Sequence, residues 1–255
     1  MDIGELVEAG ALPEARASYL KRYRASVLKA AVEGRLVPTE AELAKKEGRD
    51  YEPASVLLDL IESDRHHYWL ESGKRSKHKK AAPVDTENLP SLPEGWCWTT
   101  IGQVAPLQAG FAFSSSGYRT SGVRLLKGNN VRDGCLSDSE LDYWAEEESA
   151  EFEQYRLSEG DLVLAMDRPV YSSGSKLTKV AMLGPEWHGS LLLQRVGRFR
   201  RVDCLEAKYL YLFLSSDAFR EHLICRQNGS QDGKDLPHVS AGTVNSCPFP
   251  FPPIS

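Results

Sequence analysis

The first third of the chain has apolar positions at helical spacing. Between residues 15 and 36, apolar side chains recur every three or four positions with lysines and arginines between them, which predicts an amphipathic helix. Gly34 and Pro38 predict its end. A helix cannot bury its own apolar stripe, so we expect it to pair with a helix of this chain or of another. The residues expected in this pairing are Tyr19, Tyr23 and Val27.

Two further helices are predicted next. The sequence Thr39-x-x-Glu42 forms a capping box, in which the two residues satisfy each other's backbone N–H groups, and Gly48 ends the helix that it starts. Pro53 suits the first turn of another helix, which carries an apolar stripe up to residue 69. The first 72 residues are therefore predicted to be mainly helical.

Beyond residue 89 the apolar runs become short and are separated by glycine-containing turns, which is typical of a mixed α/β domain. The proline-rich end "PFPFPP" is expected to be extended, because proline cannot continue a helix. Two helices are predicted at 206–214 and 217–226, the second capped by Ser215 or Ser216. The predicted strands are 96–101, 123–126, 161–166, 179–183 and 195–202.

A basic stretch separates these two regions. Residues 72–88 contain five lysines or arginines and few apolar side chains, which predicts a solvated linker. Trp96 and Trp98 follow the turn signals of "LPSLPEG" and are expected in the core rather than in a binding site. The predicted organisation is a helical spacer of the coiled-coil type at 1–72, a basic linker at 73–88 and an α/β (α+β) domain at 89–255.

Composition is that of a soluble protein. The sequence lacks the run of about 20 apolar residues that a membrane helix needs, and its acidic start does not resemble a signal peptide. We therefore expect a cytoplasmic protein without membrane contact. The five cysteines stand singly, without histidines at ligand spacing, so no disulfide framework and no metal site is predicted. We expect reduced and mostly buried thiols.

Charge is distributed unevenly around the net value of -5. Residues 133–161 hold eleven carboxylates against one arginine, whereas 16–35 and 168–201 hold six and seven basic residues against one glutamate each. Net charge averages over all faces of a protein, so an acidic total does not exclude a local surface for nucleic acid.

Sequence motifs for nucleotide binding, zinc-dependent hydrolysis and serine nucleophiles are absent. A metal-dependent nuclease remains an alternative, since Asp161 or Asp167 could add a metal carboxylate to either of two short motifs. These motifs are Glu206-x-Lys208 and Asp232-x-Lys234. Such short matches are expected by chance in a chain of this length, so we favour a binding function without catalysis.

Amide, basic and aromatic side chains gather in loops of the second region, and this combination suits DNA. Asparagine and glutamine can bond adenine, and arginine and lysine can bond guanine or phosphate. Glycine and asparagine also suit tight turns, which explains the Gly-Asn-Asn sequence at 128–130 equally well. For an arginine row such as Arg198 and Arg200, the usual explanation is a solvated strand edge. The candidate DNA contacts are Phe111, Ser114, Lys127, Asn129, Asn130, Arg132, Arg168, Tyr171, Lys176, Lys179, Gln194, Arg195, Gln227, Asn228, Gln231 and Lys234.

Several segments resemble, in their order, the DNA-specificity subunit of type I restriction-modification systems. They are "LKRYRASVLKAAVEGRLVP", "EPASVLLDLI", "LPEGWCWTTIGQV", "GDLVLAMDRP", "LLLQRVGRF" and "PFPFPP". The resemblance implies target recognition domains that each read half of a bipartite site on double-stranded DNA, joined by helices in an antiparallel coiled coil. It also implies that this chain has no catalytic activity and no cofactor. Methyltransferase subunits, which carry S-adenosylmethionine and methylate adenine, and a restriction subunit are the implied partners.

A subunit of that family has two recognition domains and two helical regions, whereas this sequence has one of each. The resemblance therefore implies either a fragment or a half-subunit, which self-associates or meets a second specificity half through its N-terminal helix. A hypothesis from another class is a decoy or inhibitor that occupies the methyltransferase through its helices without reading DNA. The acidic stretch 133–161 would suit that role.

Overall fold

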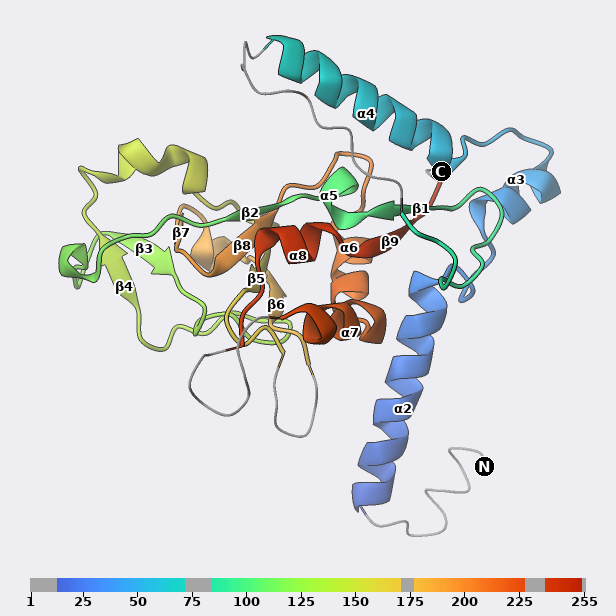
Figure 1. Ribbon diagram of the computed structural model, residues 1–255. Helices are drawn as coiled ribbons and strands as arrows, with labels where there is room; N and C mark the ends of the chain where they lie inside the picture. Colours follow the sequence, from blue (N-terminus) through green and yellow to red (C-terminus); the bar gives the residue numbers. More distant parts are fainter. Residues whose placement is uncertain (1–12, 72–83, 171–176, 228–236, 254–255) are drawn as a thin grey trace.

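The structure is a computed structural model that describes residues 13–71, 84–170, 177–227 and 237–253 (Figure 1). Its α-helices are α2 (Pro13–Val32), α3 (Glu40–Glu47), α4 (Ala54–Glu71), α5 (Ile101–Val104), α6 (Ala207–Leu214), α7 (Asp217–Arg226) and α8 (Ala241–Asn245). Its strands are β1 (Cys97–Thr100), β2 (Leu107–Ala109), β3 (Val123–Leu126), β4 (Asp142–Trp144), β5 (Leu162–Ala165), β6 (Val180–Met182), β7 (Leu191–Leu192), β8 (Val196–Phe199) and β9 (Pro248–Phe251). Short 3-10 helices occupy η1 (Ser115–Gly117), η2 (Ser149–Tyr155) and η3 (Pro185–Trp187).

A four-stranded antiparallel sheet with the order β2-β8-β5-β6 lies at the centre of the domain. The sequence Leu-Val-Leu-Ala of β5 is apolar at every position, and every one of these residues is buried. Its alternate side chains enter two different core clusters: Leu162 and Leu164 pack with α5 to α8, and Val163 and Ala165 pack with β7 and η3. The strand is therefore covered on both faces, which explains the absence of polar alternation.

Two smaller sheets complete the domain. The three-stranded sheet β4-β3-β7 lies at the left-hand end in Figure 1. The ribbon of β1 and β9 pairs Cys97 with Phe251 and Thr100 with Pro248. It therefore places the end of the described chain beside the start of the domain. Because β9 contains two prolines, it suits a two-stranded ribbon, in which each strand has a free edge.

The three N-terminal helices are present where the hydrophobic pattern predicts them. Thr39 and Glu42 form the expected capping box, and Gly48 ends α3 with a left-handed backbone at φ = 68°. Helix α2 joins the domain at its end, where Val32 is buried and its carbonyl oxygen accepts a hydrogen bond from the Tyr209 hydroxyl at 3.1 Å. In α4, Leu57, Leu58 and Ile61 pack against the main core.

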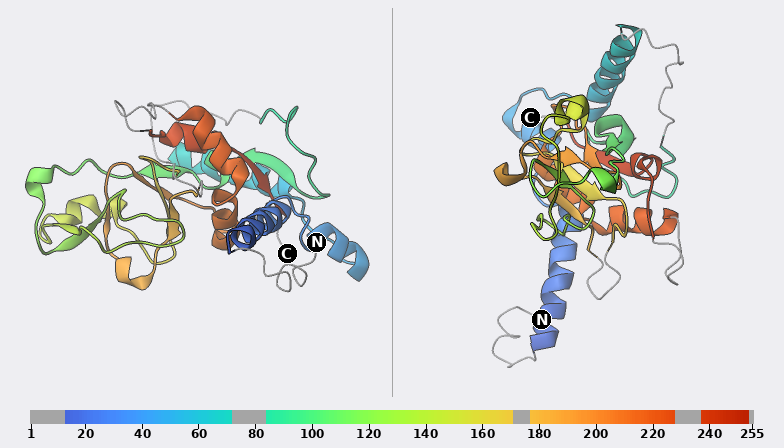
Figure 2. Two further views of the ribbon diagram at one scale, coloured as in Figure 1. Left: turned by 90° about the horizontal axis from the view of Figure 1, so that it is seen from below. Right: turned by 90° about the vertical axis from the view of Figure 1, so that its left-hand side faces the viewer.

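Helices α2 and α4 leave the domain in opposite directions, as Figure 1 and the right-hand view of Figure 2 show. Each helix therefore packs on the α/β domain rather than on the other helix. The coiled-coil character of this region stays a prediction, and so do the predicted domain limits at residues 72 and 88. Among the described residues, no helix is both long and apolar enough to cross a membrane.

All five predicted strands and both predicted helices of the domain are present, and Ser216 caps α7 by accepting from Phe219 N. The sequence missed β2, β4 and β7, which have only two or three residues each, and the short helices α5 and α8. The expectation of mostly buried thiols was wrong. Cys135 and Cys225 are exposed, Cys97 and Cys204 are intermediate, and Cys247 is buried.

The two tryptophans at the start of the domain have packing roles but are only half-buried. Trp96 makes an edge contact with Tyr209, with 5.9 Å between ring centroids. The Trp98 indole Nε1 donates to Pro90 O at 3.1 Å. Both residues therefore attach the segment before β1 to the domain.

Candidate functional site

Four cations and one carboxylate meet at one end of the central sheet. Because β5 runs antiparallel to β6 and β8, its C-terminal end lies beside the N-terminal ends of both neighbours. The loops at these ends, together with the turn after β3, carry the residues that we call the cation cluster. They are Arg132, Asp167, Arg168, Lys179 and Arg195. All four cations belong to the set of DNA contacts predicted from the sequence.

Backbone hydrogen bonds fix the segments of the cation cluster against each other. They join Met166 N to Arg195 O, Lys179 N to Pro169 O and Gly134 N to Val180 O, at 2.7, 2.8 and 2.9 Å. Arg132 therefore lies in a turn that is tied to β6, although it is 47 residues away from Lys179 in the sequence. The cluster is built on the sheet by long-range contacts, which suits a surface that must hold a fixed shape.

Lys179 lies close enough to Arg132 and Arg168 to be repelled by their charges. Burial lowers the pKa of Lys179, and the positive charges of Arg132 and Arg168 lower it further. Asp167 opposes this effect. Gathering like charges costs free energy, and a bound anion would recover it by favouring the charged form of Lys179. The cation cluster is therefore suited to binding an anionic ligand.

Two residues of the cation cluster have left-handed backbones without being glycine. Arg168 has φ = 47° and Arg195 has φ = 69°. Such a conformation costs about 1 kcal/mol for a residue with a Cβ atom, and it often occurs at functional sites. Both arginines are exposed, so burial of their side chains does not explain the strain.

The turn at 127–130 has a structural role, which corrects part of the sequence prediction. Asn130 is 0% exposed, and its amide donates to Ser137 O and Ser139 O at 2.9 Å each. Its Oδ1 atom accepts from Lys127 N at 3.0 Å. Because the amide is buried and fully used, Asn130 is not a DNA contact in this fold.

The neighbouring side chains of this turn bind the acidic segment that follows. The Lys127 ammonium forms an ion pair with Asp142 at 2.6 Å and is largely buried, and Asn129 Nδ2 donates to Glu140 at 2.6 Å. Contact of either residue with DNA would require these bonds to break. Both residues stay candidates from the sequence, but Arg132 is the member of this segment that joins the cation cluster.

The role of Asn130 leads to a prediction about stability. We expect Asn130→Ala to lower the free energy of unfolding by about 2–3 kcal/mol, because it leaves buried backbone groups without partners. Asn129→Ala is the matched control, and its exposed side chain should cost less than about 1 kcal/mol. Urea unfolding of both variants measures the difference, and equal losses would contradict the assignment.

Phe111 and Ser114 lie in another part of the domain surface. The Phe111 ring packs in an aromatic cluster with Phe113, Phe152 and Tyr155, at centroid distances of 4.8 to 5.5 Å, and is 37% exposed. Ser114 bonds to Ser116 at 2.8 Å between hydroxyl oxygens. Neither side chain belongs to the cation cluster, and their contact with DNA stays a prediction.

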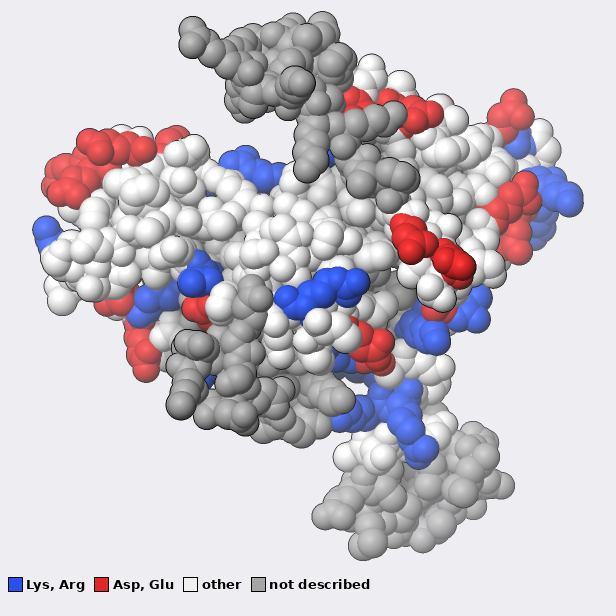
Figure 3. Space-filling model, viewed as in Figure 1, with Lys and Arg blue, Asp and Glu red and all other residues white. Residues whose placement is uncertain are grey.

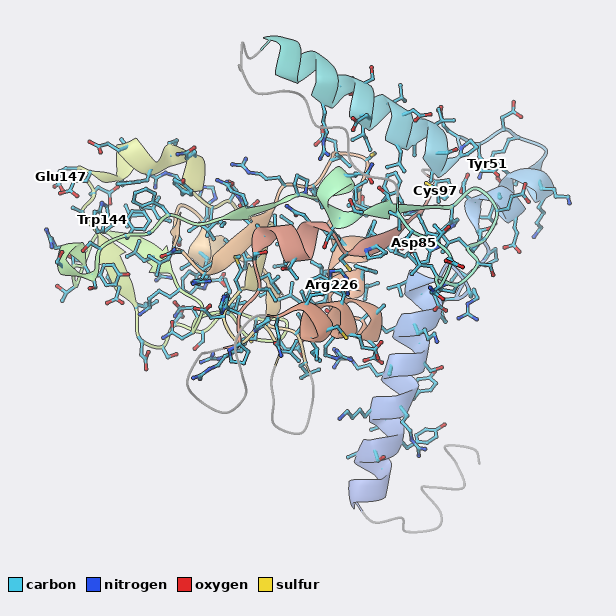
Figure 4. All side chains as sticks on the ribbon, viewed as in Figure 1. Tyr51, Asp85, Cys97, Trp144, Glu147 and Arg226 are labelled. Atoms are coloured by element: carbon cyan, nitrogen blue, oxygen red, sulfur yellow. The ribbon has the colours of Figure 1, made fainter. Side chains whose placement is uncertain are left out.

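Acidic side chains gather beside this aromatic cluster. Figure 3 shows them over β4 and η2, and Figure 4 places Trp144 and Glu147 at the same end of the domain. The residues of this acidic end include Glu146, Glu147, Glu148, Glu151 and Glu153. A DNA duplex bound at the cation cluster would be repelled by this acidic end, so the charges favour one orientation of the ligand.

The remaining predicted contacts are divided between described and undescribed segments. Gln194 is exposed and immediately precedes Arg195, and its backbone N–H donates to Phe111 O at 2.7 Å. Gln227 follows Arg226 at the end of α7, where Figure 4 labels the arginine. The other candidates lie outside the described residues, and they are Tyr171, Lys176, Asn228, Gln231 and Lys234.

Arg198 of the predicted arginine row belongs to a buried structural network rather than to a solvated edge. Arg198 is 6% exposed, and its guanidinium donates to two backbone carbonyls and two side chains at 2.6 to 3.2 Å. These partners are Arg156 O, Gln154 O, Asp161 and Gln108. Arg200, which is exposed, shares Gln108 and Gln154 O. No local pattern indicated the role of Gln108, because this residue lies 90 residues before Arg198.

The carboxylates named for a nuclease have other positions. Asp161 is a partner of Arg198, and Glu206 is the N-cap of α6, whereas the second short motif lies outside the described residues. Within the described part of the chain, no three His, Cys, Asp or Glu residues are grouped so as to hold a metal ion.

A mixed α/β domain with cations on converging loops is suited to an anion-binding protein.

Comparison with known proteins narrows this class. No family model matches the chain. The type I restriction enzyme EcoAI specificity subunit of Escherichia coli is 31% identical over 232 residues, which are 90% of this chain and 36% of that protein. The EcoEI specificity subunit of Escherichia coli is 26% identical over 235 residues, and the MjaVIII specificity subunit of Methanocaldococcus jannaschii is 28% identical over 162 residues.

Two solved specificity subunits also match. The HsdS subunit from Thermoanaerobacter tengcongensis has a TM-score of 0.43 and 18% identity, over 94% of this chain and 43% of that one. The type I S subunit from M. genitalium has a TM-score of 0.40 and 12% identity, over 66% of this chain and 36% of that one. The chain is similar in sequence to these type I restriction enzyme specificity subunits, and it spans about a third of the length of the curated relatives that it matches.

Proposed function

We propose that this chain recognises a specific sequence in double-stranded DNA, as part of the specificity function of a type I restriction-modification system. In this proposal the α/β domain reads one half of a bipartite site. The cation cluster carries the proposal, because it joins four cations from separate loops on one rigid sheet. Homology to specificity subunits agrees with a DNA ligand, and phosphates supply the anionic charge that the cluster is suited to bind.

The chain itself is proposed to be non-catalytic and without a cofactor. Its partners would be adenine methyltransferase subunits, which hold S-adenosylmethionine, and a restriction subunit. The domain would hold the methyltransferase on its target, and the partner would then remove the adenine from the base stack. In this proposal the chain acts in the cytoplasm, together with the DNA and these partners.

Selection from a pool of random duplex DNA tests the proposed function. The 255-residue chain should enrich one short sequence motif, either alone or with methyltransferase subunits present. Failure to enrich a motif under both conditions would overturn the proposal. If the chain then still bound the methyltransferase and lowered its activity, the decoy hypothesis would replace it. Metal-dependent cleavage of DNA by the chain alone would instead favour the nuclease hypothesis.

The apolar stripe of α2 supports a second part of the proposal, which is association through this helix. Tyr19 and Tyr23 stack with 6.5 Å between ring centroids, and Tyr23 and Leu20 are 55% and 50% exposed. Val27 of the same stripe is half-buried. An exposed aromatic stripe on a helix that projects from the domain loses contact with water when it pairs with another helix (Figure 1). The proposed partner is α2 of a second specificity half.

A double variant tests this pairing. We expect Tyr19→Ser with Tyr23→Ser to raise the dissociation constant for self-association at least about tenfold, because both rings leave the interface. Lys29→Ser, an exposed residue on another face of the same helix, should leave the constant unchanged. Sedimentation over a range of concentrations measures the constant. A wild-type chain that stays monomeric throughout would contradict self-association.

A further inference from the structure

Asp167 is an acidic residue in the middle of a basic surface. Its side chain is 37% exposed, it immediately precedes Arg168 in the sequence, and it forms a long ion pair with Arg195. The backbone around it is held on both sides. Met166 N donates to Arg195 O at 2.7 Å, and Arg168 N donates to Pro237 O at 2.7 Å. Asp167 itself forms a β-bridge with His238. The position of its carboxylate is therefore set by the sheet.

The carboxylate of Asp167 is not used to stabilise the fold in the way that nearby carboxylates are. Asp161 accepts hydrogen bonds from Ser158 N at 2.9 Å and Arg198 at 3.2 Å, and Asp142 binds Lys127 at 2.6 Å. Asp167 lies 3.7 Å from Arg195 Nε, which is longer than a hydrogen bond. Within the described ranges, the carboxylate forms this long ion pair and no shorter side-chain hydrogen bond, so its oxygens can accept from a ligand.

A carboxylate on a DNA-binding surface has a specific chemical consequence. It repels phosphate oxygens, so it lowers affinity for every DNA sequence unless a base donates a hydrogen bond to it. In the major groove the exocyclic amino group of cytosine is the donor that suits aspartate, whereas guanine and thymine present oxygen atoms at the corresponding positions. The arginines beside it carry the donors that fit guanine.

We propose that Asp167 is a specificity-determining residue, which accepts a hydrogen bond from the amino group of cytosine and excludes bases that present an oxygen there. This inference rests on the proposed function. The strained backbones of Arg168 and Arg195 support it, because they fix two cations of the same cluster as the carboxylate at a cost to stability. Phosphate attraction by the cations and discrimination by Asp167 would then be separate contributions of one surface.

The test compares the full chain with Asp167→Asn and Asp167→Ala in the same selection from random duplex DNA. Both variants should lose discrimination about tenfold at one position of the motif, since one good base contact contributes roughly this factor or more. Both should also bind unrelated DNA more tightly, because a repulsive charge has been removed. Glu147→Gln makes the same change in net charge at the acidic end and should keep the discrimination of the unchanged chain at every position of the motif.

The outcomes separate the inference from the proposed function. If the wild-type chain enriches no motif, the proposed function fails. If it enriches a motif and both Asp167 variants keep the same discrimination at every position, this inference is overturned while the proposed function stands. Equal loss of binding to all sequences in both variants, or equal relaxation in Glu147→Gln, would also overturn it. Circular dichroism of each variant confirms that the fold is retained.

Discussion

Replacing Arg198 by leucine is expected to lower the free energy of unfolding by about 3–5 kcal/mol, because removing one member of a buried charged network leaves the others unpaired. The guanidinium is buried and bridges Gln154 O, Arg156 O and the Asp161 carboxylate. It joins the segment after η2 to strand β8, which lies 42 residues further along the chain than Arg156. Loss of this bridge should therefore affect the whole domain.

Arg200→Leu is the matched control for this prediction. Arg200 shares two of the same partners, Gln108 and Gln154 O, but its side chain is exposed. Its removal should cost less than about 1 kcal/mol, because water can replace the lost hydrogen bonds. Urea unfolding at neutral pH measures both variants. A similar loss for the two variants would show that the network around Arg198 does not stabilise the domain as its burial implies.

Arg198 also shows where sequence reasoning about this chain stops. Local patterns predicted the elements with strong local signals, such as the capping box of Thr39 and Glu42 and the apolar run of β5. Whether an arginine on a strand faces water or a buried carbonyl depends on chain segments far away in the sequence. The alternation of β8 predicted that Arg198 and Arg200 share a face, but it carried no information about Gln108.

The candidate site likewise combines residues that local sequence predicted with an arrangement in space that it did not predict. Residue type predicted the four cations of the cluster, because arginine and lysine in loops are common DNA contacts. Their convergence depends on the antiparallel pairing of β5 with β6 and β8, which the sequence does not encode in any one segment. Asn129 and Asn130 are adjacent and of the same type, yet one is exposed and the other is fully buried. Composition cannot separate two such residues.

The acidic end and the cation cluster give the domain an uneven charge distribution that its net charge conceals. Lys127 and Asn129 of the turn after β3 bind Asp142 and Glu140, whereas Arg132 of the same segment faces the cation cluster. The acidic stretch therefore uses some of the polar groups that the sequence offers for DNA. It leaves a smaller positive surface at the end of the sheet, which is the cation cluster.

The double variant Arg168→Gln with Lys179→Gln is expected to lower affinity for DNA about 100-fold, since each charged hydrogen bond contributes roughly 1.5 kcal/mol. If both residues contact phosphate, the slope of log affinity against log salt concentration should fall by about 1.8. Binding should weaken for cognate and unrelated DNA alike. Fluorescence anisotropy with labelled duplexes at several salt concentrations measures affinity and slope together.

The pKa of Lys179 adds a signature that a general loss of stability would not produce. Burial and the neighbouring arginines lower this pKa, so its ammonium loses its proton at a lower pH than that of an ordinary lysine. Since the charged form binds phosphate, wild-type affinity should fall as the pH rises through this lowered value, and the variant should lack that step. Lys45→Gln with Lys46→Gln, at the exposed end of α3, removes equal charge elsewhere. An equal loss of affinity in this control would show that the cation cluster is not the DNA-binding surface.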